Sequence, residues 1–129
     1  MHKKILLINP PSPEFNMGLF PPLNLATIAT YIPAEYEVEI IDCNLQNIHC
    51  NTDIACITAN TYSIRRANTL CKKFRRLGIP VLFGGSHPSI LPEESIKYAD
   101  SIVIGDGEPV MPELLKDFEE GKLKKFYQP

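Results

Sequence analysis

The chain has 129 residues, enough for one domain with a buried core, and 44% of them are hydrophobic and 22% charged, as in a globular protein. The formal net charge of −2 points to no polyanionic partner such as a nucleic acid. No apolar stretch reaches the roughly 20 residues that cross a bilayer. The apolar run after Lys4 is too short for the core of a signal peptide, so we expect a cytoplasmic protein without a membrane partner.

Short apolar runs alternate with amphipathic segments along the chain, which predicts strands and helices in turn. A proline-rich loop, residues 10–22, follows the first strand and is long for a connection in a compact domain. The clearest helix spans residues 63–77, where apolar side chains recur at helical spacing and Gly78 follows as a cap. The predicted strands are residues 5–8, 36–41, 53–58, 81–83 and 102–104, and the predicted helices are residues 23–32, 63–77, 91–98 and 111–119.

This alternation predicts an α/β domain with a doubly wound, five-stranded parallel sheet and helices on both of its faces. Of the common strand orders, the flavodoxin-like (Rossmann-like) order 2-1-3-4-5 suits five strands best. The connection between the second and third strands is too short for a full helix, and we expect a turn or two of irregular helix there. Residues 1–121 form the predicted domain, and residues 122–129 form a basic and aromatic tail.

Two glycine-containing loops follow the last two strands, with the sequences GGSHP at residues 84–88 and GDGEP at residues 105–109. In an open parallel sheet, ligands bind where the carboxyl ends of the strands meet. Glycine has no Cβ, so these loops let a ligand approach bare backbone. The pattern favours a large flat ligand, with a floor formed by Ala59, Gly84, Gly85, Gly105 and Gly107 and a wall formed by Met17, Leu19 and Phe20.

Other chemistries of this architecture fit poorly. A phosphate-receiving domain needs acidic residues after the first and third strands, where this chain has Asn9 and Asn60. A flavin-phosphate loop needs free amide donors after the first strand, and the prolines there remove them. The G-x-G-x-x-G pattern of dinucleotide binding is also absent after that strand.

Five short segments occur in a fixed order along the chain. They are residues 8–11 (INPP), 21–26 (PPLNLA), 57–61 (ITANT), 84–88 (GGSHP) and 104–109 (IGDGEP). By this ordered set, rather than by one motif, the chain resembles the N-terminal cobalamin (B12)-binding domain of B12-binding radical SAM proteins.

The resemblance implies a cobalamin laid on the strand edges, with its nucleotide tail beside the sheet. Residues 58–61 and the glycine pair after the fourth strand would flank the tail, and residues 105–108 would approach the corrin ring. No catalytic residue and no metal ligand is expected. The implied cofactor-binding residues are Pro11, Phe20, Thr58, Ala59, Asn60, Thr61, Gly84, Gly85, His87, Gly105, Gly107 and Glu108.

Two departures from B12 proteins qualify what the resemblance implies. The D-x-H-x-x-G signature that supplies a histidine to the lower face of cobalt is missing after the first strand, so we expect water or nothing below the cobalt. The C-x-x-x-C-x-x-C signature that binds the 4Fe–4S cluster of radical SAM enzymes is also missing. We therefore expect a non-catalytic module, excised or truncated, whose tail begins a linker toward a radical SAM domain.

On this interpretation, S-adenosylmethionine and the iron–sulfur cluster belong to the parent protein, and methyl transfer is an expectation about that parent. The alternative is a flavodoxin-like interaction module of the same family that has lost its cofactor. Its support is the missing lower ligand, the short second connection and the missing catalytic half.

Several residues allow more than one interpretation. His87 either contacts cobalt or a corrin amide, or caps local backbone. Glu108 either bonds ring amides or stabilises a helix N-terminus. The basic residues of the helix at 63–77 form a solvated face, a docking surface for a partner domain or, least favoured, a nucleic-acid site. The four cysteines contain no C-x-x-C pair and are predicted to be buried free thiols.

Overall fold

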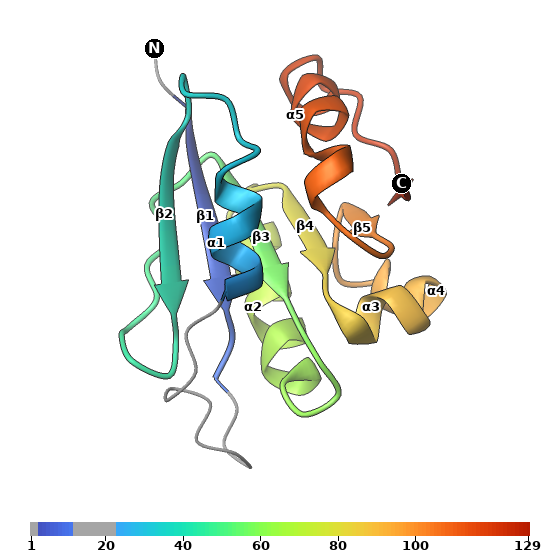
Figure 1. Ribbon diagram of the computed structural model, residues 1–129. Coiled ribbons are helices and arrows are strands. Elements are labelled where there is room, and N and C mark those ends of the chain that lie inside the picture. Colours follow the sequence, from blue (N-terminus) through green and yellow to red (C-terminus); the bar gives the residue numbers. More distant parts are fainter. Residues whose placement is uncertain (1–2, 12–22) are drawn as a thin grey trace.

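The computed structural model describes residues 3–11 and 23–129 and shows a parallel sheet between two layers of helices (Figure 1). No helix among these residues is long and apolar enough to span a membrane. The strands are β1 (Lys4–Asn9), β2 (Glu37–Asp42), β3 (Ile54–Thr58), β4 (Val81–Gly84), β5 (Ser101–Val103) and β6 (Phe126–Tyr127). The helices are α1 (Leu23–Ala29), α2 (Ile64–Arg76), α3 (Ser86–Ile90), α4 (Pro92–Ser95), the 3-10 helix η2 (Glu108–Val110) and α5 (Met111–Glu119).

The strand order is β2-β1-β3-β4-β5-β6, and every pair of neighbouring strands is parallel. The predicted order of the first five strands and the flavodoxin-like class are therefore confirmed. The sixth strand comes from the tail, where Phe126 pairs with Ile102 and Tyr127 pairs with Val103. The tail thus contributes two residues to the sheet, and a linker beginning at residue 122 stays a prediction.

The sheet divides the hydrophobic core into two layers because successive side chains of a strand point to opposite faces. In β1, Ile5 and Leu7 pack with α1 and α5, whereas Leu6 and Ile8 pack with α2. Figure 1 shows α1 and α5 in front of the sheet and α2 behind it. The four β1 side chains are fully buried, as expected for a strand that is covered on both faces.

Two tyrosines join α5 to opposite edges of the sheet. The Tyr36 hydroxyl, just before edge strand β2, donates a hydrogen bond to Glu119 Oε1 at 2.6 Å. The Tyr127 hydroxyl, in edge strand β6, donates to Asp117 Oδ2 at 2.7 Å. Burial, together with the neighbouring carboxylates, raises the pKa of both phenols. Both groups therefore stay protonated and able to donate.

Two local predictions need correction. Residues 43–53, between β2 and β3, contain bends and one isolated turn, in which the Gln46 N–H donates to the Asp42 carbonyl at 3.0 Å, but no regular helix. Thr52 and Asp53 instead bind the start of β1: the Thr52 hydroxyl donates to the Lys4 carbonyl at 2.9 Å, and Asp53 Oδ2 accepts from the Lys4 N–H at 2.7 Å. The helix predicted over residues 91–98 is shorter than expected and spans only Pro92–Ser95 (α4), and α3, which was not predicted, begins directly after the glycine pair.

Candidate functional site

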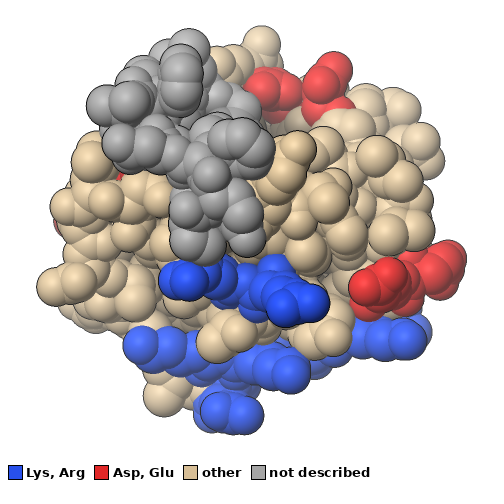
Figure 2. All heavy atoms as spheres, turned by 90° about the horizontal axis from the view of Figure 1, so that it is seen from below, with Lys and Arg blue, Asp and Glu red and all other residues tan. Residues whose placement is uncertain are grey.

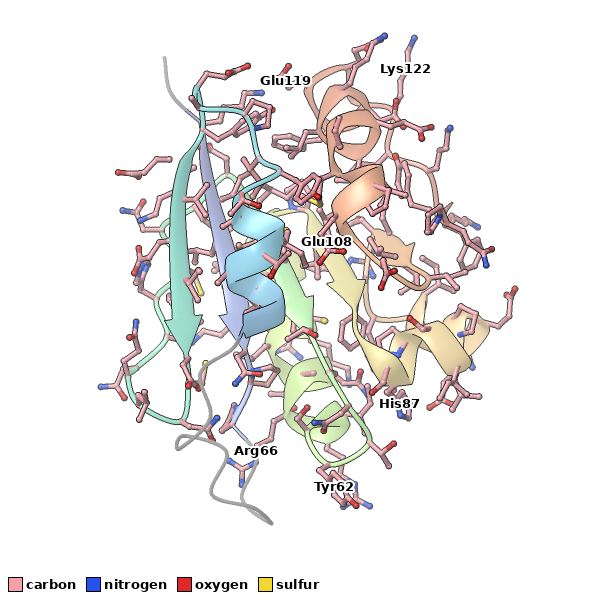
Figure 3. All side chains as sticks on the ribbon, in the orientation of Figure 1. Tyr62, Arg66, His87, Glu108, Glu119 and Lys122 are labelled. Atoms are coloured by element: carbon pink, nitrogen blue, oxygen red, sulfur yellow. The ribbon has the colours of Figure 1, made fainter. Side chains whose placement is uncertain are left out.

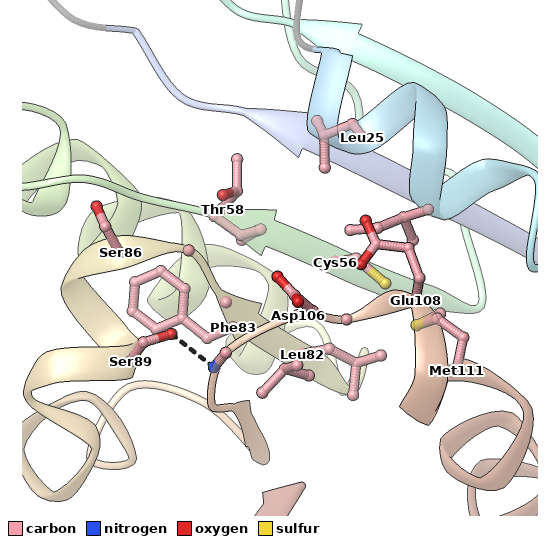
Figure 4. A pocket seen from close by; sticks show the side chains of 17 residues that line it. Leu25, Cys56, Thr58, Leu82, Phe83, Ser86, Ser89, Asp106, Glu108 and Met111 are labelled. Atoms are coloured by element: carbon pink, nitrogen blue, oxygen red, sulfur yellow. Dashed lines mark hydrogen bonds between the residues drawn. The ribbon is translucent and has the colours of Figure 1, made fainter. Parts of the chain in front are cut away.

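A cavity of about 340 Å³ opens on the face of the sheet that carries α1 and α5 (Figure 4). It lies between α1 and the loops that follow β4 and β5, near the carboxyl ends of the strands. Aliphatic, aromatic and sulfur-containing side chains form most of its wall, and glycine backbone and a few polar side chains complete it. The lining residues are Leu25, Ile28, Cys56, Ile57, Thr58, Leu82, Phe83, Gly84, Gly85, Ser86, Ser89, Val103, Gly105, Asp106, Gly107, Glu108 and Met111.

Gly85 lies where the end of β4 packs closely against the end of β3. Its backbone angles, φ 103° and ψ −177°, lie in a region that essentially only glycine adopts. A Cβ at this position would lie 2.5 Å from the Ala59 carbonyl oxygen and 2.7 Å from Thr58 Oγ1. The Ala59 N–H donates to the Gly84 carbonyl at 3.0 Å, and the Ala59 carbonyl accepts from the His87 N–H at 3.2 Å. The two strand ends therefore form one rigid rim of the cavity.

The loop after β5 is held by a different set of contacts. The Gly105 N–H donates to Ser89 Oγ at 3.0 Å, shown as a dashed line in Figure 4, and Gly105 has a positive φ of 81°. A Cβ on Gly107 would lie 3.4 Å from Ile28 Cδ1, so glycine lets α1 pack closely here. The Gly107 carbonyl accepts from the Val110 and Met111 N–H groups and so begins the helical segment η2–α5.

Two carboxylates, Asp106 and Glu108, lie in the cavity lining, and no lysine or arginine among the described residues accompanies them there. Glu108 makes no hydrogen bond or ion pair with another described residue, so its carboxylate does not cap helix amides directly. Figure 3 shows it beside α1, over the middle of the sheet. The two carboxylates can accept hydrogen bonds from the amide N–H groups of a ligand. Their negative charge disfavours a free phosphate in the same cavity.

The structure brings only part of the predicted set together. Thr58, Gly84, Gly85, Gly105, Gly107 and Glu108 line the cavity, whereas Pro11, Ala59, Asn60, Thr61 and His87 do not. Phe20, like Met17 and Leu19, lies outside the described residues. Asn60 has a local role instead, because its Oδ1 accepts from the Tyr62 and Ser63 N–H groups at 2.9 and 3.0 Å at the start of α2.

His87 sits in α3, apart from Glu108 (Figure 3). Its backbone N–H supports the rim, as described above, and its Nε2 is buried without a hydrogen-bond partner among the described residues. The structure therefore gives the backbone of His87 a local contact, and both interpretations of its side chain stay predictions.

Sequence reasoning missed the apolar walls of the cavity. Cys56, Leu82 and Val103 form its floor from three neighbouring strands, and Ile28 and Met111 contribute from the helices above them. The signal was the alternation within each strand: Cys56 lies two residues before Thr58 and so points to the same face.

The cysteines are free thiols, and no group of three potential metal ligands occurs among the described residues. Cys71 is buried as predicted, but Cys43, Cys50 and Cys56 are only partly buried. In Cys56 the exposed part faces the cavity. Burial raises the pKa of the Cys56 thiol to about 12, so it is neutral at physiological pH.

A family model and two curated relatives match this chain. A family model described as "B12 binding domain" matches residues 17–115. The chain is 31% identical over 118 residues to bacteriochlorophyllide d C-8(2)-methyltransferase of Chlorobaculum tepidum, covering 89% of this chain and 25% of the relative. It is 30% identical over 134 residues to the C-12(1)-methyltransferase of the same organism, covering 98% of this chain and 29% of the relative. The chain thus spans less than a third of the length of these relatives.

A solved structure shares the fold. It is the cobalamin-dependent S-adenosylmethionine radical enzyme OxsB with aqua-cobalamin bound, which matches with a TM-score of 0.67 and 20% sequence identity. The match covers 95% of this chain and 19% of OxsB. At this identity the likeness concerns the fold alone.

Proposed function

Since the chain belongs to the B12-binding domain family, we propose that it is a cobalamin-binding module that is not catalytic by itself. The observation that supports this most is the apolar cavity between α1 and the two glycine loops, at the carboxyl edge of the sheet. This is where open α/β sheets bind ligands. The proposal places the nucleotide tail of cobalamin in the cavity and the corrin ring across the loops at its mouth.

The residues present fit such a group. A volume of about 340 Å³ lies at the lower end of the range for small-molecule sites, so the cavity suits the tail rather than the whole cofactor. Cys56, Leu82 and Val103 offer an apolar floor for the tail's aromatic base. The bare backbone at Gly84 and Gly105 leaves room for a broad ring above them.

The lower face of cobalt would receive no histidine from residues 3–11 and 23–129. His49 and His87, the two histidines among the described residues, do not line the cavity. His49 is instead bonded to Glu39, with its Nε2 at 3.1 Å from both carboxylate oxygens. We therefore propose that cobalt has water or nothing on that face.

Bound cobalamin supplies a cobalt centre that can carry a methyl group. The chain's own contribution is to bind the tail, to orient the ring through the glycine loops and to exclude water from the cavity. We further propose that the parent protein is a radical SAM enzyme, with S-adenosylmethionine and a 4Fe–4S cluster in a second domain of the same chain. The methyltransferase names of the two relatives support methyl transfer as its reaction.

Titration with hydroxocobalamin tests the proposal. The purified chain is mixed with the cofactor, free ligand is removed by gel filtration, and the visible spectrum of the protein fraction is recorded. We expect retained corrinoid without the spectrum of histidine coordination. Cobinamide, which lacks the nucleotide tail, should bind at least about tenfold more weakly, since it leaves the apolar cavity unfilled.

A matched pair of variants locates the site. Ile28→Trp fills the cavity from α1, whereas Ala26→Trp places the same side chain on the exposed side of that helix. We expect Ile28→Trp to reduce cobalamin binding and Ala26→Trp to leave it unchanged. If no corrinoid is retained at concentrations on the order of tens of micromolar, the binding proposal fails and the interaction module is favoured. Equal effects of the two variants would place the cofactor elsewhere.

A further inference from the structure

A second hollow lies on the opposite side of the sheet, between α2 and the segment that joins α4 to β5. Its volume is about 330 Å³, and its lining residues are Lys72, Arg75, Arg76, Lys97 and Tyr98. Four of these five side chains are cationic, and they come from two parts of the chain. The hollow is therefore a built cluster of positive charge rather than a run of adjacent residues.

The positive charge of the hollow is mostly uncompensated. Arg75 Nη2 lies 3.7 Å from Asp100 Oδ1, and the other oxygen of Asp100 accepts a hydrogen bond from the Val81 N–H at 2.8 Å. The Lys72 ammonium lies 5.3 Å from the centre of the Tyr98 ring, which holds it over an aromatic face. Arg76 and Lys97 form no ion pair with a described residue. One carboxylate thus faces four cations.

The surface around the hollow is also rich in positive charge. Six of the 13 residues of α2 are basic and none is acidic, although the whole chain has a net charge of −2. Figure 2 shows the basic side chains as a band on the side that α2 occupies, while the acidic side chains visible in that view lie outside the band. Like charges four residues apart on a helix, such as Lys72 and Arg76, repel each other. This repulsion is a cost to the fold, which the attraction of Arg75 and Arg76 to the C-terminal end of the helix offsets in part.

We propose that this hollow is a docking surface for an acidic segment of a protein domain, with Arg76 and Lys97 pairing with its carboxylates. The chemistry of the neighbouring residues favours a protein over a nucleic acid. Tyr98 lies in the hollow, and Leu77, which directly follows Arg76, is 60% exposed. Aromatic, arginine and apolar side chains together are typical of protein interfaces. The net negative charge of the chain opposes the approach of a long polyanion.

The proposal does not depend on cobalamin and is tested without it. The probe is a fluorescein-labelled decaglutamate peptide, and its anisotropy is measured with the chain at about 20 mM salt, where surface charges are weakly screened. The test variant is Arg76→Glu combined with Lys97→Glu. The control is Lys116→Glu combined with Lys122→Glu, which makes the same change in net charge at exposed positions on or just after α5.

We expect the test variant to bind decaglutamate at least about tenfold more weakly, because each reversal removes an attraction and adds a repulsion. The control should change binding by less than about twofold. Circular dichroism checks that both variants fold, and Arg76→Gln with Lys97→Gln replaces the test variant if it does not. The proposal is overturned if decaglutamate does not bind or if the control weakens binding equally. Tighter binding of a ten-nucleotide oligothymidylate would also overturn it, in favour of a nucleic-acid partner.

Discussion

Replacement of Gly85 by alanine tests the rigid rim of the cavity. The backbone angles at this position cost a residue with a side chain about 1–3 kcal/mol. The added Cβ would also lie 2.5 Å from the Ala59 carbonyl oxygen and 2.8 Å from the Ala59 nitrogen, so the end of β3 must shift. Such overpacking costs about 1–3 kcal/mol. We therefore expect Gly85→Ala to lower the free energy of unfolding by about 2–6 kcal/mol, out of about 5–15 kcal/mol for a domain.

Gly78→Ala is the matched control, because Gly78 has a positive φ of 75° but nothing within 4 Å of its would-be Cβ. That variant carries only the backbone cost, about 1–2 kcal/mol. Urea unfolding of both variants, followed by far-ultraviolet circular dichroism, measures the difference. If Gly85→Ala loses no more stability than Gly78→Ala, the close contact between the β3 and β4 ends is not as described.

Three further outcomes are expected. Cyanocobalamin should protect Cys56, but not Cys43, from alkylation by iodoacetamide. Without ligand, the alkylation rate of Cys56 should rise about tenfold per pH unit up to pH 10, because the pKa of its thiol is about 12. Mass spectrometry of the labelled peptides measures both effects. Tyr127→Phe should lower the free energy of unfolding by about 1–2 kcal/mol at neutral pH. Because the pKa of Tyr127 is raised to about 12, the native protein should lose stability as the pH rises from about 10 to 12, and the variant should lose less over that interval. Ser89→Ala removes the acceptor of the Gly105 N–H and should speed hydrogen exchange of that amide, measured by NMR, while exchange in β1 stays unchanged.

The layered architecture could be predicted because a strand that is buried on both faces has a continuous apolar sequence. β1 is a continuous apolar run, and α2 has a single apolar face that ends before Gly78. Helix α3, directly after β4, was not predicted, because Pro88 suggested a loop. Proline is tolerated in the first turn of a helix, so α3 begins at Ser86, directly after Gly85. Strand β6 is two residues long and leaves no periodic signal.

The candidate site, too, could be predicted from the sequence only in part. Its rim was predictable from glycine. Because glycine weakens a strand, a glycine at a strand end often marks a place where backbone comes close to a ligand or to another segment. Gly84, Gly85, Gly105 and Gly107 do line the cavity. Its walls were not predictable, since Leu82 and Met111 look like ordinary core residues until the helices are placed over the sheet. The cofactor contact of Asn60 stays a prediction, and its place at the start of α2 shows that a polar residue after a strand can also begin the next helix.

The two tyrosine bonds of α5 have a consequence for how the cavity can admit a ligand. Because Tyr36 and Tyr127 fasten this helix to both edges of the sheet, α5 cannot tilt outward without breaking at least one of these bonds. The hydrogen bonds of Ala59 with Gly84 and His87 likewise hold the ends of β3 and β4 together. The cavity opens between α1 and the loops that follow β4 and β5, so we expect a ligand to enter there while α5 and the strand ends stay in place. In a loaded protein, we expect the change in solvent protection in α1 and in the two glycine loops that line the cavity, while the last turn of α5 keeps the protection it had before.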